Sequence, residues 1–334
     1  MSKSDRYLCI RLSALGDVVH ALNALALLRA ERPDAFIAWA VEERFASLME
    51  GHPHVDELIV VPRKRWGRMA RNPLRWPSLL GERRRMGRRL REMHIDTSLD
   101  FQSSLKSSWL VRAARPETRI GFARPVNREF NFLFQNRCVH VASERMHRTE
   151  RDLALLAPLG ITPRYEPCEL PRPDDAIRQV DDILSGAPQG DGPLVVMHPG
   201  TSAFAAFKRW PVERYSALAD RLAAERGARV VFTSGPGDRH LAVEAAEGMQ
   251  HEALVAPSDR ALPVLVELLR RADLFVGADT GPMHIASALG TPLVTMFGPK
   301  DPVQTGPFCS RSIVVTGTAE CRPCSRRKCS RREC

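Results

Sequence analysis

This chain of 334 residues has no long apolar run and little tyrosine. No segment approaches the roughly 20 apolar residues that cross a bilayer, and the apolar start at residues 7–12 is too short for a signal peptide. We therefore expect a cytoplasmic protein. Because the chain has three tyrosines and no RNA-binding signature, we do not expect nucleic acid as a partner.

Two common nucleotide-binding motifs are also missing. G-x-G-x-x-G does not occur where a strand turns into a helix, and G-x-x-x-x-G-K-[ST] does not occur at all. Their absence disfavours a dinucleotide-dependent oxidoreductase and a P-loop ATPase.

The net charge of +10 is concentrated in two segments. Between Arg63 and Arg91 there are 12 Lys or Arg residues and one acid, and the C-terminal stretch from Cys321 has six basic residues and one acid. The rest of the chain is mildly acidic, so we expect a local anionic partner. The arginine-rich segment fits a solvated helix face, a nucleic-acid surface with interleaved Trp66 and Trp76, or a site for an anionic acceptor at a membrane.

Four of the eight cysteines form a C-x2-C-x4-C-x4-C pattern at the end of the chain. Four thiolates at such a spacing can hold a structural zinc ion. The first pair has good ligand spacing, whereas the later gaps are less typical of zinc ribbons, so the sequence leaves a zinc site open. Its ligands would be Cys321, Cys324, Cys329 and Cys334.

Strand and helix patterns alternate along both halves of the chain, which predicts an α/β fold with parallel sheets. Strands are expected at 7–12, 35–41, 58–61, 97–101 and 118–122, and then at 194–198, 229–233, 274–278 and 292–297. Helices are expected at 18–30, 103–113, 212–225, 239–250, 262–271 and 282–289. A proline-rich stretch with a short helix at about 174–184 separates the halves. We therefore predict Rossmann-like domains at 1–170 and 193–334, with a linker at 171–192.

Three loops of the second half predict a nucleoside diphosphate site at one sheet edge. The strand at 274–278 ends in Asp279, Thr280 and Gly281, and Pro282 suits the first turn of a helix whose free N–H groups bind anions. His284 follows in the same helix. After the strand at 194–198, donors to phosphate come from Gly200, Thr201, Ser202 and Lys208. After the next strand, Asp238 suits a ribose diol, although a helix N-cap is an equally simple role for it.

Together, residues 13–20 (SALGDVVH), 198–201 (HPGT), 208–211 (KRWP) and 277–284 (GADTGPMH) resemble the heptosyltransferase family of inverting glycosyltransferases, glycosyltransferase family 9. The resemblance extends over nearly the whole chain. It implies the GT-B fold, in which two Rossmann-like domains with parallel sheets face across a cleft. Segments 41–45, 62–66 and 100–106 are most similar to the heptosyltransferase I branch. The C-terminal cysteines are more similar to heptosyltransferase II relatives, and Asp238 stands where the family has a longer Glu.

The resemblance implies an enzyme that moves a heptose from ADP-heptose to an anionic lipid-linked acceptor of the lipopolysaccharide inner core. Asp17 falls on the family's general base, although an N-cap role would also suit an aspartate there. The implied donor-binding residues are Thr201, Ser202, Lys208, Asp238, Asp279, Thr280, Gly281, Pro282 and His284. The acceptor-binding residues are expected to be Ser13, Gly16, Arg63, Lys64, Arg65, Lys106 and Arg128.

No cofactor is expected for this reaction, because Lys208 and the N–H groups near Thr280 do the work usually given to a divalent metal. The acceptor places the enzyme in the cytoplasm as a peripheral protein at the inner face of the cell membrane, and the arginine-rich segment would help it to dock there. Two alternatives stay open. One is a family relative that uses another nucleotide sugar, and the other is a basic, zinc-stabilised nucleic-acid-binding protein.

Overall fold

The computed structural model describes residues 5–126, 129–324, 326 and 329. The chain divides into two compact units, Met1–Pro171 (unit 1) and Arg172–Cys334 (unit 2). Residues 172–192, which were expected to link the domains, lie within unit 2. There α6 (Asp174–Ser185) packs against α9 (Leu262–Arg271) through the apolar face that holds Val180.

Unit 1 is built on a parallel sheet of six strands in the order β3-β2-β1-β4-β5-β6. The strands are β1 (Arg6–Ile10), β2 (Phe36–Glu42), β3 (Glu57–Val61), β4 (Thr97–Asp100), β5 (Thr118–Phe122) and β6 (Arg137–Val139). The helices are α1 (Leu15–Glu31), α2 (Arg63–Ala70), α3 (Trp76–Glu92), α4 (Leu105–Ala114) and α5 (Arg148–Ala154), with short 3₁₀ turns η1 (Glu43–Leu48), η2 (Pro73–Arg75), η3 (Asn131–Phe134) and η4 (Ala157–Leu159).

Unit 2 repeats this arrangement with a parallel sheet in the order β12-β11-β10-β7-β8-β9. The strands are β7 (Leu194–His198), β8 (Arg229–Phe232), β9 (Leu254–Val255), β10 (Leu274–Ala278), β11 (Leu293–Phe297) and β12 (Ser312–Thr316). Besides α6 and α9, its helices are α7 (Val212–Arg226), α8 (Arg239–Glu247), α10 (Gly281–Leu289) and α11 (Pro302–Thr305), and η5 (Ala203–Lys208) follows β7.

Both sheets have the strand order of a Rossmann fold, which confirms the predicted fold class. In such sheets the order reverses between the first and the fourth strand, and ligands bind beyond the carboxyl ends of those strands. The reversal lies between β1 and β4 in unit 1, and between β7 and β10 in unit 2. The segments that carry Asp17, Thr201 and Asp279 directly follow β1, β7 and β10, three of these four strands.

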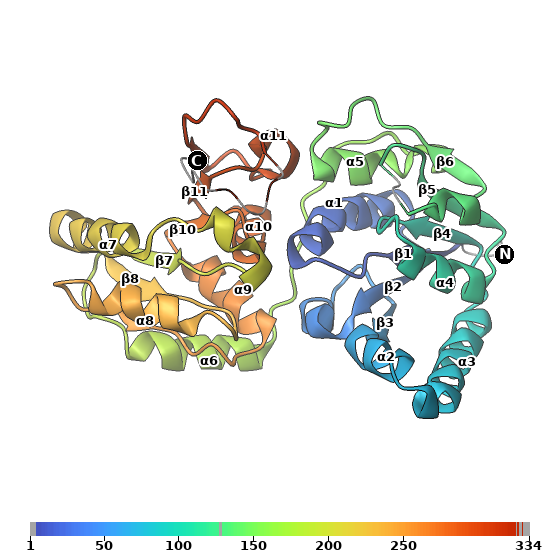
Figure 1. Ribbon diagram of the computed structural model, residues 1–334, viewed down its shortest axis with the longest axis horizontal. Helices are drawn as coiled ribbons and strands as arrows, with labels where there is room; N and C mark the ends of the chain where they lie inside the picture. The colour runs from blue at the N-terminus through green and yellow to red at the C-terminus, as the bar shows by residue number, and fades with distance from the viewer. Residues whose placement is uncertain (1–4, 127–128, 325, 327–328, 330–334) are drawn as a thin grey trace. The chain divides into compact units, whose positions relative to one another are not determined.

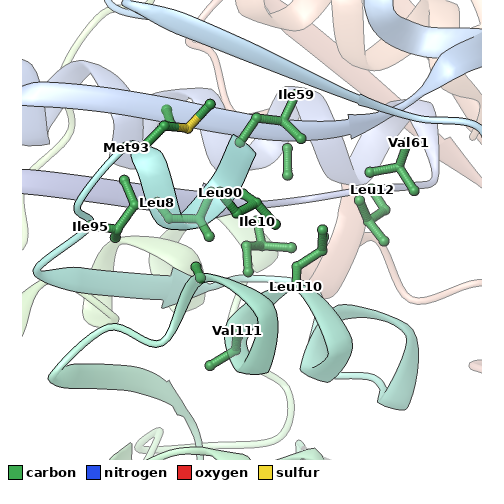
Figure 2. Close-up of a cluster of buried hydrophobic side chains, with 13 residues drawn as sticks. Leu8, Ile10, Leu12, Ile59, Val61, Leu90, Met93, Ile95, Leu110 and Val111 are labelled. Carbon is green, nitrogen blue, oxygen red and sulfur yellow. The ribbon is translucent and has the colours of Figure 1, made fainter. Parts of the chain in front are cut away.

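Apolar side chains from both the sheet and the helices fill the core of each unit. In unit 1, Leu8 and Ile10 of β1 pack with Leu90 of α3 and Leu110 of α4, as Figure 2 shows. In unit 2, Val195 and Met197 of β7 belong to a cluster with side chains of α7, α8, β8 and β10. The central strands are buried on both faces, which explains their nearly continuous apolar sequences.

The arginine-rich segment forms the hairpin of α2, η2 and α3, which Figure 1 shows at the periphery of unit 1. The segment is therefore helical, and its proposed binding partner stays a prediction. The short edge strands β6, β9 and β12 were not predicted. Among the described helices, none has the length and apolar character required to cross a membrane.

Candidate active site

Asp17 is the third residue of α1 and lies in its first turn. Ala14 is the N-cap of this helix, so Asp17 does not have the N-cap role considered from sequence. Its Oδ2 instead accepts from the N–H of Ala14 at 3.1 Å. Its other oxygen, Oδ1, accepts from Arg148 Nη1 at 2.7 Å and lies 3.2 Å from Arg11 Nη2. The Asp17 side chain stays 25% exposed, so an incoming hydroxyl group can reach it.

The charges around Asp17 determine its protonation. Burial alone would raise the pKa of this carboxyl, but the guanidinium groups of Arg11 and Arg148 outweigh that effect, helped by His20 and the Ala14 N–H. The pKa of Asp17 is therefore held well below its usual range. Asp17 is ionised at neutral pH, as a proton acceptor must be.

Residues that follow β4 hold in place the turn at residues 11–14, which precedes Asp17 and which we call the Asp17 loop. The side-chain oxygen of Gln102 accepts from the N–H groups of Leu12 and Ser13 at 2.9 and 3.0 Å, and Arg11 donates to the Phe101 carbonyl. The loops after β1 and β4 are thus hydrogen-bonded to each other at the point where the strand order reverses. No local pattern indicates the roles of Gln102, Arg11 or Arg148, because each bonds to a residue far along the chain or to a backbone group.

A buried polar network lies beneath this loop. Asp100 Oδ1 accepts from the N–H groups of Gln102 and Ser103 at 3.0 and 3.1 Å, and its Oδ2 accepts from Asn131 Nδ2 at 2.9 Å. Burial raises the pKa of Asp100, although these hydrogen bonds and one from Ser107 act in the opposite direction. The network fixes the end of β4 and, through Gln102, the Asp17 loop.

Of the residues expected to bind the acceptor, Ser13 and Gly16 lie in or next to the Asp17 loop. Arg63 and Arg65 begin α2, but both already form ion pairs, at 2.8 Å with Glu42 and Glu82 respectively. Two other expected residues are exposed and form no ion pair within the described part of the chain, namely Lys64 and Lys106. Arg128 lies outside the described residues.

Lys208, Asp279 and His284 converge at the reversal point of the second sheet. Lys208 Nζ lies 2.5 Å from Asp279 Oδ2, and His284 Nε2 lies 3.5 Å from Asp279 Oδ1. Lys208 comes at the end of η5 after β7, whereas the other two residues follow β10. The structure therefore joins two motifs that are about 70 residues apart, as their positions at neighbouring strand ends predict.

The Asp279 carboxylate is charged and lies beside the start of α10. Burial would raise its pKa, but the hydrogen bond from His284 and the charge of Lys208 lower the pKa of Asp279 to about 2. Thr280 is the N-cap of α10, and Pro282 lies in its first turn, as predicted. The first N–H groups of this nine-residue helix give its start a partial positive charge that attracts anions.

The remaining residues expected at the donor site have mainly local contacts. Thr201 accepts from Arg209 Nε at 3.0 Å, and Ser202 is exposed before η5. Asp238 is buried, and its Oδ1 accepts from the Gly235 N–H at 2.6 Å. Its Oδ2 lies so close to Gly200 that a Cβ there would be 2.0 Å away. The carboxylate of Asp238 thus hydrogen-bonds within its own loop in this structure. Its contact with a ribose stays a prediction.

The structure does not support the zinc site considered from the cysteine spacing. Cys321, Cys324 and Cys329 are described, whereas Cys334 lies outside the described residues. Within the described residues, no group of three or more His, Cys, Asp or Glu side chains is arranged to hold a metal ion. Cys324 Sγ instead accepts from the N–H of Arg326 at 3.3 Å.

Comparison with known proteins agrees with this geometry. Residues 83–334 match the model of glycosyltransferase family 9 (heptosyltransferase). The chain is 32% identical to lipopolysaccharide heptosyltransferase 1 of Pseudomonas aeruginosa, over 97% of this chain and 87% of that protein.

Two solved structures of Escherichia coli heptosyltransferase WaaC are also similar. The one with ADP has a TM-score of 0.76 and 28% identity, and covers 93% of each chain. The one with ADP-2-deoxy-2-fluoro heptose has a TM-score of 0.74 and 29% identity, over 93% of this chain and 92% of that one. The chain therefore belongs to glycosyltransferase family 9, the heptosyltransferases, and is an enzyme that transfers a glycosyl group.

Proposed function

We propose that this enzyme transfers a heptose from ADP-heptose to an anionic, lipid-linked acceptor of the lipopolysaccharide inner core, at the inner face of the cell membrane. One observation carries the proposal: Lys208 and Asp279 meet beside the N-terminus of α10, where a sheet of this order binds ligands. The similarity to structures named for ADP and for an ADP-heptose analogue supports adenine as the base of the donor nucleotide.

In the proposed reaction, the leaving diphosphate is stabilised by groups of unit 2. Lys208 brings a positive charge, and the free N–H groups at the start of α10 donate to phosphate oxygens. Asp279 has a different role, because an ionised carboxylate repels phosphate. It positions Lys208 and His284, both of which it contacts. With these groups present, we expect the enzyme to need no divalent metal.

Asp17 is the proposed general base. The acceptor hydroxyl oxygen bonds to the anomeric carbon, its proton passes to the Asp17 carboxylate, and the bond from that carbon to the diphosphate breaks with inversion. The low pKa of Asp17 makes it a weak base while Arg11 and Arg148 hold it, although a general base works best when its pKa is near the operating pH.

Arg148 offers a way to strengthen the base when the acceptor is present. Its side chain is 35% exposed, whereas that of Arg11 is 3% exposed. A phosphate or carboxylate of the acceptor would bind Arg148 and so compete with Asp17 for it. Losing this partner raises the pKa of Asp17, so the proposed base becomes stronger when the acceptor is bound.

A panel of nucleotides tests the proposed donor. A ligand that binds the folded protein raises its melting temperature, and we expect ADP to raise it far more than UDP or GDP at equal concentration. A larger response to UDP or GDP would assign another nucleotide sugar. No response to any of the three would contradict the proposed donor site.

A further inference from the structure

The turn between α2 and α3 exposes large apolar side chains. Leu74 is 89% exposed, and Trp76 and Leu80 are 53% and 51% exposed. All residues from 70 to 78 are exposed, and Leu74 is the most exposed of the large apolar side chains that the structure describes. We call residues 70–80 the hairpin tip.

The hairpin tip is ordered by its own hydrogen bonds. Asn72 Oδ1 accepts from the N–H of Leu74 at 3.1 Å, and the indole N–H of Trp76 donates to the Ala70 carbonyl at 3.1 Å. The polar atom of Trp76 is thus satisfied within the tip, while 53% of the residue stays exposed. At the other end of α3, Leu90 is fully buried in the core of unit 1 (Figure 2). The tip is therefore a fixed apolar projection on a firmly anchored helix.

Positive charge surrounds this projection and is not neutralised locally. Glu82, the one acid between Arg63 and Arg91, pairs with Arg65 and accepts from the Trp66 indole. Exposed arginines of the hairpin that form no ion pair with any described residue are Arg68, Arg71, Arg75, Arg84, Arg85 and Arg88. Exposed apolar groups flanked along the hairpin by unneutralised arginines match the interface of an anionic lipid layer.

The order of residues along α3 fits the depth profile of such a layer. Positions four apart lie on one face of a helix, and the exposed residues at this spacing are Trp76, Leu80, Arg84 and Arg88. At about 1.5 Å per residue, Arg84 lies about 6 Å from Leu80 along the axis. The long side chain of an arginine at this distance from an inserted apolar residue can reach the lipid phosphates.

We infer that the hairpin tip inserts into an anionic lipid leaflet, with Leu74, Trp76 and Leu80 among the acyl chains and the surrounding arginines on lipid phosphates. A nucleic acid would satisfy the arginines and stack on Trp76, but it offers no apolar layer for Leu74 and Leu80. The inference extends the proposed function, because a lipid-linked acceptor brings the enzyme to a bilayer. Vesicle binding needs neither donor nor transfer, so this inference can fail while the proposed function stands.

Vesicles of phosphatidylethanolamine and phosphatidylglycerol test the insertion with the full chain. We expect the vesicle partition coefficient of a variant with Leu74→Ser, Trp76→Ser and Leu80→Ser to be at least about tenfold lower than that of wild type. Each apolar side chain that inserts contributes to this coefficient. A control variant with Leu133→Ser and Ile313→Ser changes exposed apolar residues elsewhere, which are 69% and 63% exposed. The control should bind within about twofold of wild type. Equal binding by the tip variant and wild type would overturn the inference.

Two further measurements separate insertion from simple charge attraction. Lipids brominated on the acyl chain should quench wild-type fluorescence more than that of a Trp76→Phe variant, and equal quenching would overturn insertion. Replacing Arg71, Arg75 and Arg84 by Gln should weaken binding to the anionic vesicles and reduce its dependence on salt. If the tip variant keeps vesicle binding but loses binding to single-stranded DNA, the surface belongs to nucleic acid and the inference is wrong.

Discussion

Replacing Lys208 by alanine should weaken ADP binding by about 10- to 150-fold, because a hydrogen bond to a charged group contributes about 1.5–3 kcal/mol and each 1.4 kcal/mol is a factor of ten. The starting geometry supports a large effect. Lys208 Nζ lies 2.5 Å from Asp279 Oδ2 and its side chain is 18% exposed, so its ammonium group is held beside the N-terminus of α10 before any ligand binds.

The same contact predicts how a second substitution behaves. Without Lys208, the Asp279 carboxylate, which is 8% exposed, loses its positive partner and repels the diphosphate. Asp279→Asn removes that repulsion, so the double variant should bind ADP more tightly than Lys208→Ala alone. If Lys208 were merely structural, the double variant would bind ADP no more tightly than Lys208→Ala alone.

Isothermal titration with ADP measures both effects. Lys106→Ala serves as a matched control, because Lys106 is an exposed lysine of unit 1 with no ion pair among the described residues. The Lys106→Ala variant should bind ADP with the affinity of wild type. Unchanged affinity in Lys208→Ala, or a double variant that binds more weakly than Lys208→Ala, would refute the proposed role of Lys208.

Three other predictions follow from the described contacts. Asp17→Asn should slow transfer by at least about 100-fold, as loss of a general base does, while calorimetry shows ADP binding unchanged; turnover within about tenfold of wild type would exclude Asp17 as the base. Gly200→Ala places a Cβ 2.0 Å from Asp238 Oδ2, so it should lower the free energy of unfolding by about 1–3 kcal/mol. Urea denaturation that finds no loss would show that the loop accommodates the Cβ without strain. Asp279 has a pKa lowered to about 2, so its charge should stabilise the protein above the unfolded pKa of about 3.9, and this stabilisation should be lost as the pH falls toward 2. The free energies of unfolding of wild type and Asp279→Asn, measured by urea denaturation, should therefore differ less at pH 3 than at pH 6.

Much of the parallel-sheet framework could be predicted from sequence because its central strands are continuous apolar runs. The strands at 194–198 and 274–278 were predicted with the bounds that the structure has, and so was the helix at 262–271. The polar motifs were predictable for a related reason. They directly follow these strands, and parallel strand ends meet at one edge of a sheet.

Other features depend on contacts that no local pattern records. Arg148 pairs with Asp17 across 131 positions, and Gln102 bonds to backbone groups 89 and 90 positions away. The helices α2 and α3 have so many arginines that few apolar residues remain to reveal a helical period. The direction of the Asp238 carboxylate depends on how closely Gly200 approaches it, which only the folded backbone determines.

The division of the chain after Pro171 has a consequence for how such enzymes diversify. Asp17, the arginine-rich hairpin and the expected acceptor residues all belong to unit 1, whereas each proposed donor contact belongs to unit 2. Each unit also has its own sheet and its own apolar core. If each proposed contact belongs to its unit in this way, we expect a gene fusion with its junction at this point to exchange one specificity and keep the other. We therefore expect a junction after Pro171 to suit hybrid transferases that combine the acceptor of one parent with the sugar nucleotide of another.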